Sequence, residues 1–160
     1  MPLTDEQLQT IEALAQNEDA IGDLYKAYSE ILHDHNHFFA RMVDEERGHA
    51  IWLRRLSATV DNKDLNFNKE RFNREIIERS ISHVRNMEKE AREKGIDLMT
   101  AVTNSAVVEN ALLEKKFFEV FDGDSEEVKR IMINLARASA DHRDHVRKFL
   151  EDLKSGQVEA

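Results

Sequence analysis

Apolar residues recur at alternating intervals of three and four along most of the chain, which is the spacing of one face of an α-helix. Polar clusters and glycines interrupt this pattern and divide the chain into segments. Thr4 and Gln7 have the spacing of a capping box, which marks the start of the first helix. The Asn- and Asp-rich stretch TVDNKDLNFN is predicted to be a loop. The pattern predicts five helices, at about 4–32, 36–58, 69–93, 97–121 and 126–154.

Ionisable residues interrupt the apolar rows of four of these helices. In the second helix, Glu46 and His49 share the phase of Phe39 and Met42. A buried ionised group needs a partner, because its burial alone costs many kcal/mol. Gly48 costs about 1 kcal/mol relative to alanine in a helix, so we expect close helix packing there. The ionisable residues in the apolar rows are Glu18, Glu46, His49, Glu114, His142 and His145.

The two ends of the chain repeat one layout. Glu18 and Glu46 are 28 residues apart, as are Glu114 and His142, so the halves superpose with an offset of 96 residues. The coincidence of ligand-type positions predicts a duplicated helical hairpin in one domain, 1–160, with halves at about 4–58 and 97–154. The helix at about 69–93 then lies in the crossover between them. Glu109 is off the predicted apolar row and is expected to be solvated.

Charge and composition narrow the classes of partner. The net charge of −9 disfavours nucleic acid and anionic membrane surfaces. The chain has no cysteine, which excludes disulfides and thiolate metal sites. Its first residues are polar and of mixed charge, and no apolar run has the length of a membrane span. We therefore expect a cytoplasmic helical protein that binds neither nucleic acid nor membrane.

Glu18 with Tyr25, then Glu46-x-x-His49, then a second hairpin of similar layout resembles the rubrerythrin family of ferritin-like di-iron carboxylate proteins. The segments NEDAIGDLY, DEERGHA and ENALLEKKFFEVFDGDS are similar to short members without a rubredoxin domain. The resemblance implies an all-α fold, a ferritin-like antiparallel four-helix bundle with an additional helix in the crossover. It also implies the metal ligands: Glu18 and Glu114 as single carboxylates, Glu46 as a bridge, and His49 and His145 as terminal imidazoles.

His142 departs from the family pattern, since it stands where the second Glu-x-x-His motif would have its glutamate. An imidazole can bind one metal through nitrogen but cannot bridge two closely spaced ions as a carboxylate does. Two divalent ions bring a charge of +4, and three carboxylates leave about +1 uncompensated. A bound anion, or occupancy by one metal, would restore the balance.

The resemblance implies iron, as two ions or one, and the ligand set also suits manganese or zinc. Peroxide or oxygen reduction and ferrous iron oxidation are the expected activities, with Tyr25 as the candidate catalytic residue through a hydroxyl near the metals. Packing of Tyr25 in the core is the alternative. A peroxidase would need a separate electron-donor protein, because the chain has no cysteine for an iron–sulfur centre. A homodimer or larger homo-oligomer is expected. The alternative function is a metal-poor or single-metal bundle with a binding or structural role.

Overall fold

The computed structural model describes residues 4–59, 65–67, 74–111, 121–123 and 126–158. Within these ranges the chain is mostly helical, with two three-residue strands. In order, the elements are α1 (Asp5–Ile31), the short 3-10 helix η1 (His33–His35), α2 (Asn36–Thr59), β1 (Leu65–Phe67), α3 (Arg74–Lys94), α4 (Leu98–Glu109), β2 (Phe121–Gly123) and α6 (Glu126–Lys154). These bounds confirm the predicted first, second and last helices.

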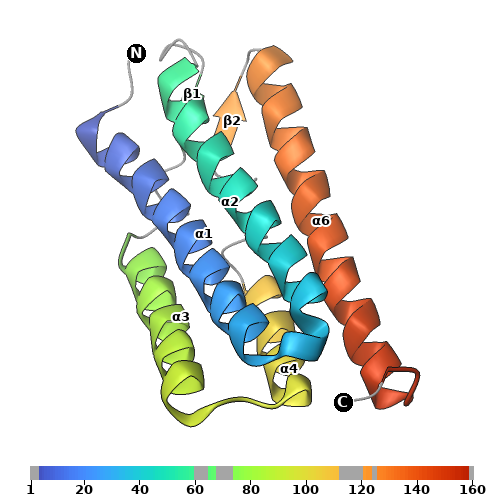
Figure 1. Cartoon of the computed structure of the whole chain (residues 1–160). Coiled ribbons are helices and arrows are strands. Elements are labelled where there is room, and N and C mark those ends of the chain that lie inside the picture. The colour runs from blue at the N-terminus through green and yellow to red at the C-terminus, as the bar shows by residue number, and fades with distance from the viewer. Residues whose placement is uncertain (1–3, 60–64, 68–73, 112–120, 124–125, 159–160) are drawn as a thin grey trace.

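Helices α1 and α2 form a long antiparallel hairpin that turns through η1 (Figure 1). The predicted capping box is present at the start of α1, where Gln7 N–H donates to Thr4 Oγ1 at 3.3 Å and Thr4 N–H donates to Gln7 Oε1 at 2.8 Å. Helix α1 also packs against α3, so it is buried on two sides. Its central position explains why Leu24, Tyr25 and Tyr28 are completely buried.

Ion pairs fix the register of α1 against α2. Arg47 pairs with both Asp19 and Asp23, and Arg54 pairs with Asp19 at 2.8 Å. Each pair is partly exposed, so the individual stabilisation is small, but the charges form a network across the same pair of helices. The network holds the turn of α1 that contains Glu18 beside the turn of α2 that contains Glu46.

All five described α-helices contribute buried residues to one hydrophobic core. Tyr28 of α1 and Phe39 of α2 meet at its centre, with ring centroids 5.4 Å apart. Val84 of α3, Val102 of α4 and Val146 of α6 belong to the same cluster of buried residues. The structure therefore shows a helical bundle around a shared core.

Helix α4 differs from its prediction. It begins after Asp97, whose carboxylate accepts from Thr100 N–H at 2.8 Å, and ends at Glu109 rather than near residue 121. Phe121 lies in strand β2, so the prediction of a helix at this residue was wrong. Residues 112–120 of the predicted helix lie outside the described residues. Val107, seven residues before Glu114 and therefore in the same predicted apolar row, is 60% exposed. The phase was misread because polar and apolar residues are mixed around α4, so its sequence has little amphipathic signal.

The two strands form an antiparallel ribbon, with Leu65 opposite Gly123 and Phe67 opposite Phe121. Part of the predicted loop is therefore a strand, because its partner comes from a segment more than 50 residues away, which local sequence cannot reveal. Helix α3, Arg74–Lys94, confirms a helix in the region predicted at about 69–93, and its place in a ferritin-like crossover stays a prediction. Among the described residues, no helix combines the length and apolar character that crossing a bilayer requires.

Candidate metal centre

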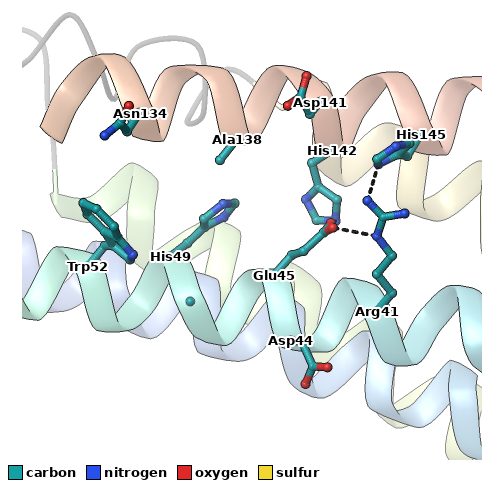
Figure 2. Close-up of a pocket in the computed structure, with 11 residues that line it drawn as sticks. Arg41, Asp44, Glu45, His49, Trp52, Asn134, Ala138, Asp141, His142 and His145 are labelled. Atoms are coloured by element: carbon teal, nitrogen blue, oxygen red, sulfur yellow. Dashed lines mark hydrogen bonds and ion pairs between the residues drawn. The ribbon is translucent and has the colours of Figure 1, made fainter. Parts of the chain in front are cut away.

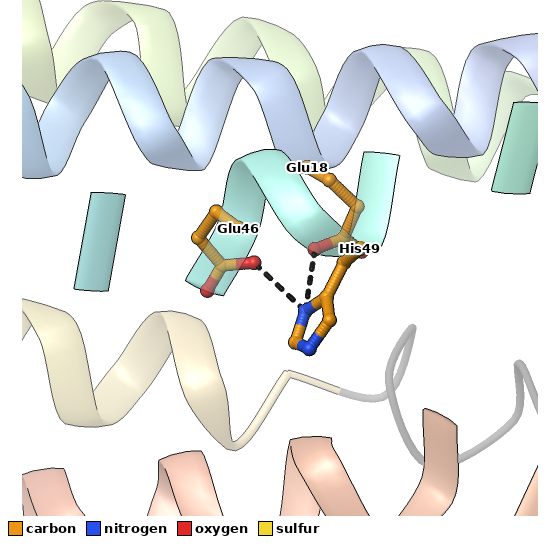
Figure 3. A group of neighbouring side chains, drawn as sticks. All are labelled: Glu18, Glu46 and His49. Atoms are coloured by element: carbon orange, nitrogen blue, oxygen red, sulfur yellow. Dashed lines mark hydrogen bonds and ion pairs between the residues drawn. The ribbon is translucent and has the colours of Figure 1, made fainter. Parts of the chain in front are cut away.

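The first group of candidate ligands lies between α1 and α2. Glu46 and His49 are one turn apart on α2, and Glu18 faces them from α1 (Figure 3). His49 Nδ1 is 3.2 Å from Glu46 Oε2 and 3.7 Å from Glu18 Oε2. The side chain of Glu46 is completely buried, and those of Glu18 and His49 are 12% exposed. One candidate ligand atom from each residue lies within 4.8 Å of the others, so the group could hold a metal ion.

The second group shares Glu46 and adds one residue each from α4 and α6. His142 Nδ1 is 3.0 Å from Glu46 Oε1 and 3.3 Å from Glu109 Oε2. All three side chains are at most 1% exposed. These ligand atoms also lie within 4.8 Å of one another. Glu46 thus presents one carboxylate oxygen to each group.

Several buried polar atoms of these residues have no hydrogen-bond partner. They are Glu18 Oε2, Glu46 Oε1, Glu109 Oε2, and both ring nitrogens of His142. A buried polar atom without a partner costs about 1–3 kcal/mol, and native proteins have few of them. The five atoms do not carry this full cost, because each lies 3.0–3.7 Å from a carboxylate oxygen or an imidazole nitrogen. A cation could replace these close pairs as the common partner of the atoms, so the residues present fit a metal ion.

Burial and mutual charge shift the pKa values of this cluster in opposite directions. Burial and the neighbouring Glu46 charge raise the pKa of Glu18 to about 8. Burial also opposes the ionisation of Glu46, but its contacts with His142 and His49 prevail and lower its pKa. Burial alone would lower the histidine values, yet the surrounding carboxylates raise the pKa of His49 to about 10 and that of His142 to about 11. At neutral pH without metal, both imidazoles therefore hold protons that a cation would displace.

Tyr25 reaches the second group. Its hydroxyl donates to Glu109 Oε1 at 2.5 Å, and both side chains are buried. Its ring also meets the His142 ring edge-on, with centroids 6.3 Å apart. The contact fixes one oxygen of Glu109 and leaves Oε2 facing His142.

Of the ligands predicted from sequence, the structure brings together Glu18, Glu46, His49 and His142. Glu114 lies outside the described residues. His145 is in neither group: it is exposed on α6, with its Nδ1 3.4 Å from Arg41 Nη2. Metal ligation by Glu114 or His145 stays a prediction.

Glu109 corrects the sequence analysis, because it is 1% exposed rather than solvated. It was missed because the assumed phase of α4 pointed its apolar row elsewhere. The sequence did contain a signal. Glu109 is a lone acid in the run AVVENALL, four residues after Ser105 and seven after Val102, both of which are buried. An acid in the helical row of buried residues is the criterion that had identified Glu18.

A pocket of about 380 Å³ opens beside the cluster, between α2 and α6 (Figure 2). His49 and His142 line it, so one histidine of each group faces this pocket. Gly48 lines it too, and a Cβ atom built there would meet no atom within 4 Å. The close helix packing expected at Gly48 is therefore wrong, and the glycine leaves open space.

The arrangement comprises three carboxylates and two imidazoles whose side chains are at most 12% exposed. Oxygen and imidazole ligands of this kind suit divalent iron, manganese or zinc. In comparisons with known proteins, no family model, no curated protein and no solved structure matches this chain.

Proposed function

We propose that the chain is a rubrerythrin-like, ferritin-like di-metal protein that binds two divalent ions, with iron as the natural metal. The observation that supports this most is the position of Glu46, which belongs to two Glu/Glu/His groups and directs one oxygen towards each. A carboxylate shared in this way is suited to bridge two ions. The buried atoms without hydrogen-bond partners would each gain a partner on metal binding.

Glu18 and His49 would hold the first ion with Glu46, and Glu109 and His142 would hold the second. A bound ferrous pair would supply two electrons together, which suits reduction of peroxide or dioxygen and ferrous iron oxidation. The residues around it would exclude water and fix the ligands. Tyr25 would act as a positioning residue, since its hydroxyl restrains Glu109. With no cysteine in the chain, a peroxidase would draw its electrons from a separate donor protein.

A single-metal protein is the second candidate, and the charge count favours it. Glu18, Glu46 and Glu109 bring three negative charges against the four positive charges of two divalent ions. One ion in either group would leave the cluster without excess positive charge. Such a protein would bind or sense a metal without two-electron chemistry.

Anaerobic titration of the untagged protein with Co²⁺ or Fe²⁺, followed by metal analysis, tests both. We expect about two ions per chain, falling to about one in Glu18→Gln and in Glu109→Gln. Glu151→Gln, which neutralises an exposed acid on α6, should still bind two. One ion in the unaltered protein would favour the single-metal candidate. Absence of bound metal would contradict the proposal.

A further inference from the structure

The pocket between α2 and α6 joins the protein surface to the buried ligand groups. Arg41, Glu45 and Gly48 line it from α2, and His142 lines it from α6 (Figure 2). Glu45 is 30% exposed, whereas His142 is 1% exposed. The length of one side chain therefore separates the partly exposed part of the pocket from a buried candidate ligand.

Glu45 spans this passage. Its Oε2 lies 3.2 Å from His142 Nε2, and its Oε1 accepts from Arg41 Nε at 2.9 Å. His142 Nε2 is buried, and Glu45 Oε2 is the group that faces it from the pocket. The other ring nitrogen, Nδ1, is 3.0 Å from Glu46. A continuous series of ligand-type atoms thus runs from Glu45 through the His142 ring to Glu46.

The charges along the pocket favour a cation over an anion. Glu45 lies inside it, whereas Asp44 and Asp141 lie on the two helices that border it, with their carboxylates directed away from the space between the helices (Figure 2). Arg41 is the only Lys or Arg side chain among the residues that line the pocket, and Glu45 accepts from it. The protonated rings of His49 and His142 add two positive charges, which the carboxylates of Glu46 and Glu109 behind them offset. Low-dielectric walls concentrate such a field and increase the local concentration of the attracted ion.

We propose that this pocket is the route by which divalent cations reach the buried ligands, and that Glu45 transfers the ion from the surface to the groups that share Glu46. The proposal rests on the proposed metal-binding function. Arg41 competes with the incoming ion, because its guanidinium pairs with the Glu45 carboxylate until the ion displaces it. Glu45 belongs to the route and not to the final ligand set, so it governs the rate of uptake more than the affinity.

Gly48 supplies a steric test of the route. Because a Cβ atom at this position would meet open space, Gly48→Leu would project a side chain into the pocket. A block of this kind slows association and dissociation by the same factor, since it raises a barrier without changing the bound state. Glu45→Gln removes the transferring charge, whereas Arg41→Gln removes the competing cation. Glu151→Gln is the control, because it loses one acid on α6 outside the pocket.

The experiment is stopped-flow uptake of Co²⁺ by the metal-free protein, with release measured by chelator competition and affinity by equilibrium dialysis. Trp52 lines the pocket and is the only tryptophan in the sequence, so its fluorescence reports the arrival of Co²⁺. We expect Glu45→Gln to slow uptake roughly tenfold with a much smaller loss of affinity, and Arg41→Gln to accelerate it about threefold. Gly48→Leu should slow uptake and release equally, and Glu151→Gln should match the unaltered protein.

The outcomes separate this proposal from the metal-binding function. If Co²⁺ binds but Glu45→Gln and Gly48→Leu take it up at the unaltered rate, the route is wrong and the function stands. If Glu45→Gln loses affinity by the same factor as rate, Glu45 is a ligand and the transfer role is overturned. If no protein binds Co²⁺ at equilibrium, both proposals are overturned. Circular dichroism of each variant shows whether it is folded.

Discussion

The two ligand groups share Glu46 but are assembled from different parts of the chain. Glu18, Glu46 and His49 come from α1 and α2, which are neighbours in sequence and pack along their lengths. The second group adds Glu109 of α4 and His142 of α6, so it needs three helices in place. The first group can form once a hairpin has closed, whereas the second requires the complete bundle.

The two ligand groups also differ in how far their side chains are buried. Glu18 and His49 are each 12% exposed, while Glu109 and His142 are almost completely buried. A group that is open on one side can be solvated when it is empty, but a closed group must satisfy its charges internally. We therefore expect the second group to be the more sensitive to changes in neighbouring side chains.

The largest expected effect comes from the residue that the two groups share. Glu46→Gln removes the charge that faces both His49 and His142, so affinity for both ions should fall more than about 100-fold, exceeding the loss typical of an indirect ligand contact. Anaerobic Fe²⁺ titration measures it, with Glu151→Gln as the control. Full retention of one ion would show that Glu46 serves a single group.

A change of pH should affect the two groups unequally. Metal displaces protons from groups whose pKa lies above the solution pH, so affinity falls as pH falls. The first group contains Glu18, with a pKa raised to about 8, and His49, raised to about 10. The second group contains His142, whose pKa is raised to about 11. Between pH 7 and pH 6, each displaced proton weakens binding about tenfold, which predicts about 100-fold for the first group and about tenfold for the second.

The measurement is Co²⁺ affinity against pH in Glu109→Gln, which retains the first group, and in Glu18→Gln, which retains the second. Proton release into a weakly buffered solution provides an independent readout. Equal slopes in the two variants would contradict the assignment of protons to Glu18 and His49.

Tyr25 should affect one group only. Tyr25→Phe removes the hydroxyl that donates to Glu109, and loss of such a contact to a ligand weakens metal binding on the order of tenfold. The affinity of the first group should not change. Tyr28→Phe is the matched control, because the Tyr28 hydroxyl is equally removed from solvent but meets Asn104 instead of a ligand. The same loss in both variants would indicate a general packing effect.

The smallest effect is on stability. Gly48→Ala should raise the free energy of unfolding by about 1 kcal/mol, because alanine favours the helix and its Cβ would meet no atom within 4 Å. Urea denaturation of the metal-free protein measures the change. A loss of stability would mean that Gly48 is needed for close packing, as the sequence had suggested.

The sequence by itself determined most helix bounds and the first group. Residues three apart lie on the same face of a helix, so Glu46 and His49 had to point the same way, and Glu18 was the acid in the apolar row of the adjacent helix. The same rule placed His142 in the interior, where it is 1% exposed. These are consequences of helical periodicity, which acts locally and needs no knowledge of neighbours.

Only the tertiary structure decided which residues complete the second group. Polar and apolar residues are mixed around helix α4, so its sequence does not reveal which face turns inward. Packing against α6 and the core selects the face that contains Glu109. His145 had the spacing of a ligand, yet α6 turns Val146 inwards and leaves His145 at the surface beside Arg41. The physical reason is that a helix may rotate about its axis by a fraction of a turn at little local cost, and only contacts with other helices fix that rotation.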